Sequence, residues 1–586
     1  MSDPIPHKPA DIREFTPRSI AVGLLVAVII GASYPYVVLK FGIGPNISVV
    51  SAFFGFLALG IFSKGYNRWE NNVVQTAGTS AGQIAFICWL LAAFDILAAE
   101  PGSGFDVHLT RLQIWLWLST AGILGVFLAV PLRKHFIDDE KLPFPDGIAA
   151  GETLIMLDSR GPQARKSTLT MVGSLFVSGL VFFATQARWI IEVIAVRVNS
   201  WSPTVGLGFA LSLLNVGSGM IIGLRITASM FLGAILAWVV APDWLLAHGY
   251  IGAHAKRTEI LLTVMWPGIA VLIAGGITTL LLRWRSLVSS FRSLSSSGSV
   301  SGDMPLKWVG LGSATAAIAL IAIQSSFFGT PVWQSVIAIA LAAPLGLVAL
   351  RVLGETNWGP ISTMANLTQA VFGAIAPGSL NASMVSSGVT GAVAAESEGI
   401  MQDYKVGSMI GSTPKILTYM QLLAVPVGAL ALAFAYPLLR DTYGIIGDNA
   451  QLSSPVSARW VGFAKIVTQQ LSGPGALTPE AMLRISWMKS SFAVGALIGV
   501  LLTLLEQNKS WRRFVPSPTG MGIGVLIPIS AVSVMFIGAA ADWVWEKVNA
   551  VTHTRYSIAT ASGFIAGEAI VAVIIPILVT LGLMKL

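Results

Sequence analysis

The feature that most restricts the fold of this chain is a long series of apolar segments separated by short polar ones. A helix needs about 20 mainly apolar residues to cross the roughly 30 Å hydrocarbon layer of a bilayer. About fifteen segments approach that length, and a weaker sixteenth covers 360–376. The fifteen lie near 19–40, 44–63, 71–97, 112–131, 168–188, 205–222, 224–242, 259–282, 306–326, 332–353, 380–397, 412–438, 481–505, 519–545 and 555–583. The sequence therefore predicts an all-α polytopic membrane protein with about sixteen transmembrane helices.

Composition supports a membrane protein. Of the 586 residues, 54% are hydrophobic and 11% are charged, and the mean hydropathy is +0.75, whereas an ordinary soluble chain carries about 25% charged residues. The single cysteine, Cys88, excludes an internal disulfide framework. The formal charge of +8 does not indicate a nucleic-acid partner, because the Lys and Arg residues lie in short loops, as in membrane proteins that follow the positive-inside rule.

The charges of the loops predict an orientation in the bilayer. The N-terminal segment carries Lys8, Arg13 and Arg18, whereas the loop at 98–111, on the opposite side, carries two acids and only Arg111. We therefore expect a cytoplasmic N-terminus. No cleavable signal peptide precedes the first apolar segment, and the loops are compact, so we expect a bacterial inner membrane.

A short repeat predicts two homologous halves. Gly44-Pro45 recurs as Gly359-Pro360, and Ser202-Pro203-Thr204 recurs as Ser517-Pro518-Thr519, both 315 residues later. The Ser/Arg-rich segment between the halves has the composition of a flexible linker. Eight spans in each half would make the repeats parallel. The predicted division is a cytoplasmic segment 1–18, a transmembrane half 19–282, a cytoplasmic linker 283–305 and a second transmembrane half 306–586.

The stretch 366–415 carries the most unusual chemistry of the chain. It is apolar or small for most of its length, yet Glu396, Glu398, Gln402, Asp403 and Lys405 follow a probable membrane segment directly. Ionisable groups at that depth are costly and indicate function. Seven glycines and two prolines in the same stretch predict a broken helix, which a membrane tolerates only where protein or water satisfies the backbone. The stretch therefore predicts a path for a solute.

A second polar run opens the segment at 70–82. Glu70 is followed by Asn72, Gln75 and Thr79 at helical spacing, so the three fall on one face. A capped helix start with small-residue packing would explain the run. An amide stripe facing lipid would be expensive, so a role in lining a solute path is the alternative.

The run LPFPDGIAAGE at 142–152 is too short to span a membrane. Pro143, Phe144 and Pro145 predict an extended entry, after which Asp146 can cap a short helix that bears Glu152. Two structures fit this pattern equally well, a re-entrant hairpin and an interfacial amphipathic helix.

Other polar residues lie at or inside apolar segments. Tyr34, Tyr36 and Lys40 end the first segment, where an aromatic belt and a snorkelling lysine are the ordinary interpretation. Glu568 lies deep in the last apolar segment and Asp95 in the third, so each needs a partner or a function.

An enzyme is not expected. The sequence contains no His-Glu-x-x-His, no P-loop and no Gly-x-Ser-x-Gly, and its six histidines lie at or near predicted loops. We expect no cofactor and no metal held by protein ligands.

Three runs in order resemble the oligopeptide transporter (OPT) superfamily: ENNVVQT at 70–76, LPFPDGIAAGE at 142–152 and GIMQDYKVGSMIGSTP at 399–414. The MQDYKVG element looks more like the yellow stripe-like, metal-chelate branch, and the Asn-Pro-Gly element of the peptide branch is absent. The resemblance implies a proton-driven secondary transporter that imports short peptides or metal bound to a small amino-acid-derived chelator. It carries over to Glu70, Asn72, Gln75, Pro143, Pro145, Glu152, Gln402, Asp403 and Lys405.

The functional hypothesis is proton-coupled symport, and a gradient-independent channel is the alternative. A carboxylate that is buried in one state and hydrated in another has a state-dependent pKa, which couples proton binding to conformational change. The proposed coupling residues are Glu152, Glu396, Glu398, Asp403 and Glu568, although Asp403 and Lys405 could instead pair with each other. The proposed substrate-binding residues are Tyr34, Tyr36, Lys40, Glu70, Asn72, Gln75, Gln402 and Lys405. Expected partners are the substrate, protons and the lipid bilayer, and small-residue helix faces would permit a homodimer.

Overall fold

The structure is a computed structural model that describes most of the chain as helices. It covers residues 8–9, 12–41, 47–62, 67–100, 103–158, 162–282, 302–446, 452, 454–470, 479–508, 510–511 and 514–580. Of the predicted linker 283–305, only 302–305 lie within these residues, and Gly44-Pro45 lies outside them.

The elements follow the chain in this order. Up to residue 282 they are α1 (Pro17–Phe41), α2 (Ile47–Phe62), α3 (Arg68–Phe86), α4 (Cys88–Ala98), α5 (Arg111–Ala129), η1 (Val130–Leu132), η2 (Lys134–Asp139), α6 (Pro145–Asp158), α7 (Pro162–Gln186), β1 (Val193–Ala195), α8 (Ser202–Val205), β2 (Gly208–Ala210), α9 (Leu213–Ile222), α10 (Leu224–Ile235), η3 (Leu236–Val240), α11 (Ala241–Ala247) and α12 (Arg257–Leu282). From residue 306 they are α14 (Leu306–Phe328), α15 (Val332–Thr356), α16 (Ile361–Ile375), α17 (Leu380–Ile410), α18 (Pro414–Tyr443), α19 (Pro455–Gln470), α20 (Pro479–Gln507), α21 (Pro518–Leu526), α22 (Ile529–Val548) and α23 (Ala550–Thr580). The strands β1 and β2 form one small antiparallel pair, in which Ile194 lies opposite Phe209.

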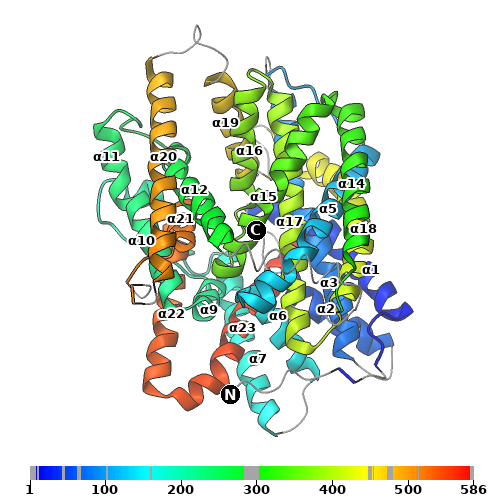
Figure 1. Ribbon diagram of the computed structural model, residues 1–586. Helices are drawn as coiled ribbons and strands as arrows, with labels where there is room; N and C mark the ends of the chain where they lie inside the picture. The colour runs from blue at the N-terminus through cyan, green and yellow to red at the C-terminus, as the bar shows by residue number, and fades with distance from the viewer. Residues whose placement is uncertain are drawn as a thin grey trace.

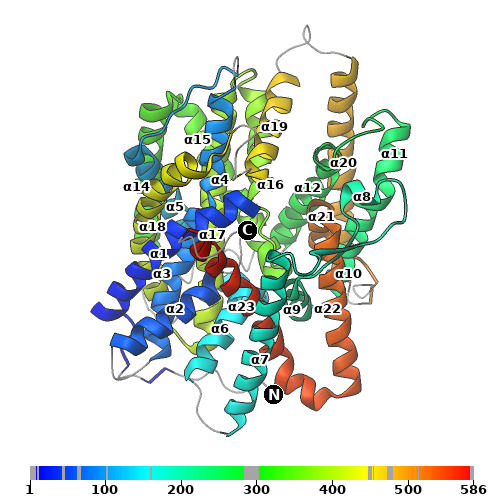
Figure 2. The ribbon, with the colours of Figure 1, turned by 180° about the vertical axis from the view of Figure 1, so that it is seen from behind.

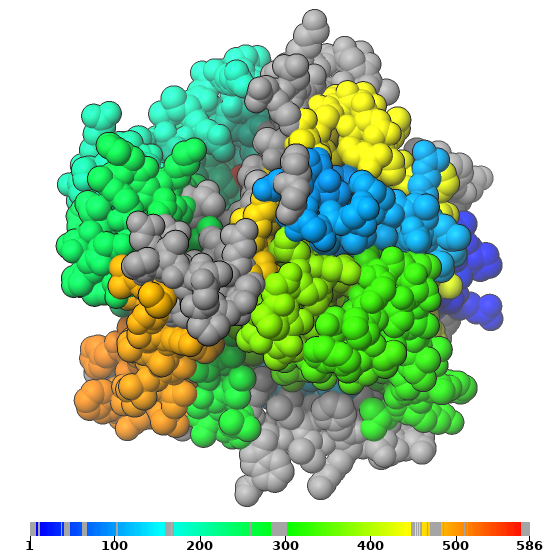
Figure 3. Space-filling model, turned by 90° about the horizontal axis from the view of Figure 1, so that it is seen from above, coloured from blue at the N-terminus to red at the C-terminus, as the bar shows by residue number. Residues whose placement is uncertain are grey.

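The helices form two blocks, and each block draws on both halves of the chain (Figure 1). The first block contains α1 to α5 and α14 to α19, and the second contains α7 to α12 and α20 to α23. From above, the second block lies to the left of the first (Figure 3). The short helix α6 lies between the blocks, because it packs against α2 and α17 of the first and against α23 of the second (Figure 2).

The packing of the first three helices recurs in the second half. In the first half α1 and α2 both pack against α3, and in the second half α15 and α16 both pack against α17. The two ends of α15 lie 315 residues after those of α1, which is the spacing of the sequence repeat. In the second block, α12 packs against α20 and α21, and α23 packs against α7 and α9.

The two sets of helices run in opposite directions, so the prediction of parallel repeats is wrong. The Trp69 indole near the start of α3 donates to the Ile410 carbonyl at the end of α17 (2.9 Å). Further along α3, the Ser80 hydroxyl donates to Glu396, which lies earlier in α17 (3.2 Å). In the chain, the helix α14 lies between the set α1 to α3 and the set α15 to α17. One additional membrane crossing reverses the direction of the helices that follow it.

Eleven of the described helices are long and apolar enough to cross a membrane, so the count of about sixteen is not confirmed. Two apolar segments that were predicted as spans are the short helices α2 and α9. The helix α19 lies in a stretch where no span was predicted. The architecture is nonetheless that of an all-α polytopic membrane protein.

The predicted break in the stretch 366–415 lies between α16 and α17, and α17 itself is continuous through its glycines. The reason is close packing. A Cβ atom at Gly388 would lie 2.9 Å from the ring of Trp117, and one at Gly399 would lie 2.7 Å from the side chain of Gln83. These glycines let neighbouring helices approach without ending α17.

Candidate functional site

The polar residues of α17 lie on two different faces of one helix. Glu396 and Asp403 are seven residues apart and share a face that packs against α3. Glu398, Gln402 and Lys405 are spaced by four and three residues and share another face. This second face lies toward α6 and the turn between α15 and α16.

The first face holds Asp403 in a network of side chains. The Gln75 amide donates to Asp403 Oδ1 (2.6 Å) and to the Thr79 hydroxyl (2.8 Å). Thr79 donates in turn to Ser48 on α2 (3.0 Å). Asp403 is fully buried, and its Oδ2 accepts no hydrogen bond from any described residue. The predicted polar stripe of α3 therefore faces protein, and it contacts the most polar part of α17.

Glu396 lies further along the same face. Its Oε2 accepts hydrogen bonds from Ser80 on α3 (3.2 Å) and from Gln421 on α18 (2.8 Å). Its Oε1 is buried without a hydrogen-bond partner among the described residues. Glu396 and Asp403 are thus bonded to hydroxyl and amide groups only.

The second face begins with Glu398, which lies in a constricted place. Glu398 is 3% exposed and forms no hydrogen bond or ion pair with any described residue. Its carboxyl group lies against Gly359, where an added Cβ atom would be 1.9 Å from Oε2. Only glycine leaves room for the carboxyl group at this turn between α15 and α16.

Lys405 and Gln402 continue this face toward α6. The Lys405 ammonium donates to the Leu142 carbonyl oxygen (3.0 Å). A Cβ atom at Gly147 on α6 would lie 2.8 Å from the Gln402 carbonyl oxygen, so the two helices touch there. The alternative that Asp403 and Lys405 pair with each other is wrong, because residues two apart project from different sides of a helix and each has another partner.

The run from Pro143 to Asp146 joins α6 to the end of α15. The Phe144 amide donates to the Gly354 carbonyl oxygen (3.0 Å). The Asn357 side chain accepts from the Asp146 amide (3.0 Å) and donates to Asp146 Oδ1 (2.8 Å). The Asn357 amide also donates to the Ser218 hydroxyl on α9 (3.2 Å), so this junction links both blocks.

The helix α6 begins at Pro145 and is enclosed by protein. Its buried residues are Pro145, Gly147, Ala149, Ala150, Gly151, Thr153 and Leu154. Burial around so much of the helix does not fit an interfacial amphipathic helix, which keeps one face in water. Glu152 is half-buried and forms no hydrogen bond or ion pair with any described residue.

Two residues of the polar run at 70–82 have structural partners. Glu70 forms an ion pair with Arg18 and accepts a hydrogen bond from Thr16 (2.5 Å), which joins the starts of α1 and α3. The Asn72 amide donates to Ser412 in the turn after α17 (2.8 Å). These contacts tie the N-terminal segment to the end of α17.

Tyr34 and Tyr36 are buried in the first block, and the ordinary interpretation as an aromatic belt is therefore wrong for them. Each is 4% exposed, and Tyr36 packs edge-on against Tyr443 with 5.5 Å between ring centres. Lys40 lies in the last turn of α1, and its side chain is outside the described part of the chain.

Glu568 has the geometry of a helix cap. The Ser212 hydroxyl donates to both carboxyl oxygens (2.9 and 3.0 Å), and the Leu214 amide donates to Oε2 (3.0 Å). These donors belong to the first turn of α9, where a carboxylate is favourable. Asp95, the other buried acid, accepts a hydrogen bond from Tyr436 (2.5 Å) and pairs with Arg440.

Sequence reasoning missed Gln421 and Asn357. Gln421 was visible as a single amide within an apolar segment, which in a membrane needs a polar partner. Asn357 gave a weaker signal. It has a φ angle of +60°, and asparagine is one of the few residues that tolerate this conformation.

The described residues contain no group of three or more His, Cys, Asp and Glu side chains that could hold a metal ion. They also contain no Lys, Arg or His that pairs with Glu396, Glu398 or Asp403. What distinguishes the site is therefore a set of buried acids without counter-ions between packed membrane helices.

A polytopic bundle with uncompensated acids on a central helix defines an integral membrane protein of the transporter class. Residues 14–579 match the family described as OPT oligopeptide transporter protein, so the chain belongs to the OPT family. The predicted resemblance is confirmed.

Relatives of the chain have names from both branches. A probable metal-nicotianamine transporter of Arabidopsis thaliana is 24% identical, over 95% of this chain and 86% of its own length. A metal-nicotianamine transporter of the same plant is 24% identical, over 95% of this chain and 92% of its own length. A protein of Haemophilus influenzae, provisionally named an oligopeptide transporter, is 24% identical over 93% of this chain and 92% of its own length. All three names describe transport, in agreement with the expectation that the protein is not an enzyme.

Proposed function

We propose that this protein is a secondary active transporter that couples the uptake of a small peptide, or of a peptide-like metal chelate, to protons. The observation that carries the proposal is the position of Glu398. It is a buried carboxyl group without a hydrogen-bond or ion-pair partner among the residues that the structure describes, on the face of α17 that meets α6 and the turn after α15. A carboxyl group in such a place can exchange a proton when its surroundings change.

The two charges on this face fit a zwitterionic substrate. Lys405 is a cation whose only hydrogen-bond partner among the described residues is the Leu142 carbonyl oxygen, and it forms no ion pair with them. Lys405 can therefore bind a carboxylate of a peptide or of an amino-acid-type chelator. Glu398 lies about two helical turns away and can receive the amino group, with Gln402 between them.

The face toward α3 has a different proposed role. Glu396 and Asp403 are buried, and they accept hydrogen bonds from side chains of α3 and α18, which belong to the first block. We assign them to proton binding, and Glu398 to the exchange between proton and substrate. Glu152, half-buried on α6, is the next candidate for coupling. Because Glu568 caps α9, it ranks last among the proposed coupling residues.

The names of the relatives indicate two kinds of substrate. The plant relatives are named for metal-nicotianamine, and the Haemophilus influenzae relative is named for oligopeptides. The chemistry shared by both substrates is the presence of carboxylate and amino groups in one small molecule. We therefore propose a substrate that carries both groups. A direct comparison of uptake decides between a peptide and a metal chelate.

The test is uptake into proteoliposomes under an imposed inward proton gradient, with a labelled tetrapeptide and a labelled iron complex of an amino-acid-type chelator as the two substrates. We expect uptake of at least one of them, and a protonophore should abolish it. Uptake that persists after the gradient collapses would indicate a channel. Glu398→Gln should lose proton-driven uptake and keep the fold, because the amide has the same shape as the carboxyl group.

The matched control is Glu546→Gln, since Glu546 is an exposed carboxyl group at the end of α22. It should transport like the unchanged protein. If Glu398→Gln and Glu396→Gln both leave proton-driven uptake intact, the assignment of these acids is wrong.

We further propose that the side on which α1 and α3 begin faces the cytoplasm of a bacterial inner membrane. Arg18 and Arg68 lie on this side, in agreement with the positive-inside rule. A single cysteine introduced at Lys307, at the start of α14, should react with a membrane-impermeant thiol reagent only in inverted vesicles. Labelling in intact cells would place this side outside.

A further inference from the structure

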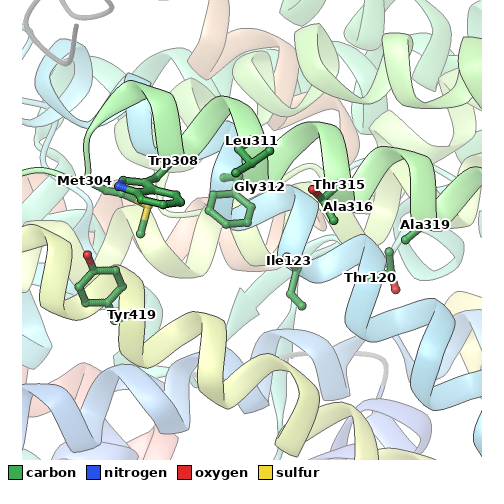
Figure 4. A pocket seen from close by; sticks show the side chains of 11 residues that line it. Thr120, Ile123, Met304, Trp308, Leu311, Gly312, Thr315, Ala316, Ala319 and Tyr419 are labelled. Atoms are coloured by element: carbon green, nitrogen blue, oxygen red, sulfur yellow. The ribbon is translucent and has the colours of Figure 1, made fainter.

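A groove of about 550 Å³ lies on the first block between α5, α14 and α18, and Figure 4 shows the side chains that line it. Side chains from all three helices line it, including Phe127, Trp308, Leu311 and Tyr419. Leu311 is 59% exposed and Trp308 is 54% exposed, so the groove opens on the outside of the bundle. In a membrane protein an apolar groove on this surface faces lipid.

The groove has the length of one leaflet. Its lining residues on α14 run from Trp308 to Ala319, over which a helix rises about 16 Å at 1.5 Å per residue. Half of a hydrocarbon core of roughly 30 Å is about 15 Å. An acyl chain lying along α14 would therefore fill the groove without crossing the midplane.

One end of the groove carries aromatic and basic residues, which favour a lipid headgroup. Trp308 and Tyr419 lie at this end, and such amphipathic rings are enriched at the level of lipid headgroups. Lys307 precedes the lining residue Leu311 by one helical turn, and its ammonium is 5.6 Å from the centre of the Trp308 ring. Lys415 precedes Tyr419 by one turn. Both lysines lie at the same ends of α14 and α18, where the Lys415 amide donates to the Gly302 carbonyl oxygen (3.0 Å).

The two lysines supply positive charge that no acid in the described part of the chain neutralises by an ion pair. Neither forms an ion pair with any described residue. By contrast Arg133, nearby at the end of α5, is bound to Asp303 at 2.6 Å. Two cations without an ion-pair partner among the described residues, at the aromatic end of an apolar groove, are complementary to an anionic phospholipid.

We propose that the groove between α5, α14 and α18 binds one anionic phospholipid, with an acyl chain along α14 and its phosphate between Lys307 and Lys415. A second copy of this chain is a poorer occupant. A groove that is narrow, concave and one leaflet long accepts a chain, whereas helix dimers pack through small residues along a whole span.

Photolabelling of the full-length protein in nanodiscs tests the proposal. Phosphatidylglycerol and phosphatidylcholine with the same diazirine-bearing acyl chain are compared, and labelled residues are mapped by mass spectrometry. Phosphatidylglycerol should label Leu311, Thr315 and Ala319 more strongly than phosphatidylcholine. Each of Lys307→Gln and Lys415→Gln should lower the phosphatidylglycerol labelling by about five-fold and leave the phosphatidylcholine labelling unchanged.

A variant that fills the groove gives an independent measurement. Thr315→Trp places a large ring among the lining residues and should abolish labelling by both lipids. Ile318→Trp is the matched control, because Ile318 lies on the same helix outside the groove and is 69% exposed. Its labelling should equal that of the unchanged protein.

Two outcomes overturn the proposal. One is equal labelling of the groove by the two lipids, which would mean an unselective lipid surface. The other is protein-to-protein crosslinking from the groove, which would mean a second copy occupies it. If Thr315→Trp does not fold, the lysine variants decide alone, because Lys307 is exposed, Lys415 is only partly buried, and glutamine keeps most of the length of the side chain.

Discussion

The residues of α17 illustrate what a sequence reveals about a buried polar site and what it withholds. Glu396, Glu398 and Asp403 were identified as functional candidates because charge inside an apolar segment is costly. The sequence did not show which residues form hydrogen bonds with them. Gln75 and Asp403 are separated by 328 residues, and both were singled out, but only folding brings them within 2.6 Å. The sequence shows which polar groups lie in apolar segments, and the packing of the helices determines which of these groups come into contact.

Asn357 shows the opposite case, a residue whose importance depends on its backbone. Its φ angle of +60° lies in the left-handed region, and its side chain makes two hydrogen bonds with Asp146. The hydrogen bonds cannot be predicted from an asparagine between a threonine and a tryptophan, and the tolerance of asparagine for the left-handed region is only a weak signal. The Gly-Pro element that follows Asn357 drew attention for its repeat and not for its geometry.

We expect Asn357→Ala to destabilise the junction between α15 and α6. The change removes three hydrogen bonds, two with Asp146 and one to Ser218, at about 1 kcal/mol each, and adds about 1 kcal/mol of left-handed strain. Asn357→Gly keeps the backbone relaxed and loses only the hydrogen bonds, so it should be less damaging. Thermal unfolding in detergent should rank the unchanged protein above the glycine variant, and the glycine variant above the alanine variant. Equal melting of all three would show that the junction contributes no stability.

At the level of elements, glycine was the least certain signal. Glycine can end a helix, or it can allow another helix to approach, and the sequence does not distinguish these two uses. Within α17 the second use holds, because neighbouring helices fill the space above Gly388 and Gly399. The start of α6 was better specified. Pro145 fits the first turn of a helix, as proline geometry predicts. The predicted extended entry is wrong at Phe144, whose φ angle of +45° lies in the left-handed region.

The contact between α5 and α17 gives a prediction about such glycines. A Cβ atom at Gly125 would lie 2.5 Å from the Val393 carbonyl oxygen, and the Ser397 hydroxyl donates to the Gly125 carbonyl oxygen (2.8 Å). Gly125→Ala should therefore push α5 away from α17 and destabilise the protein by about 1–3 kcal/mol. The measurement is unfolding by a denaturing detergent.

The matched control is Gly310→Ala on α14, where an added Cβ atom would meet nothing within 4 Å. Replacing a glycine in a helix by alanine without a clash should stabilise by about 0.5–1 kcal/mol. A Gly125→Ala protein as stable as Gly310→Ala would refute close packing as the role of Gly125.

For the whole molecule, the sequence predicted a repeat and misjudged its direction. The spacing of 315 residues is confirmed by the ends of α1 and α15. The direction was inferred from a count of spans, and counting cannot separate full crossings from short helices such as α2 and α9. Nor could it show that each half contributes to both blocks, since that depends on contacts between distant helices. Inverted repeats shared between two bodies are typical of transporters that alternate access by moving one body against the other.

Relative motion of the two blocks can be tested by joining them at α12 and α15. A Cβ atom at Gly276 would lie 3.7 Å from Val348 Cβ, which is within the range for a disulfide. In a Cys88→Ala background, Gly276→Cys with Val348→Cys should form a disulfide on oxidation, abolish proteoliposome uptake and recover on reduction. The control joins two helices of the first block, with Gly391→Cys on α17 and Ala365→Cys on α16 at 4.0 Å, and should transport in both states. Full uptake by the oxidised α12–α15 variant would mean that the blocks stay fixed and that only elements within them, such as α6, move.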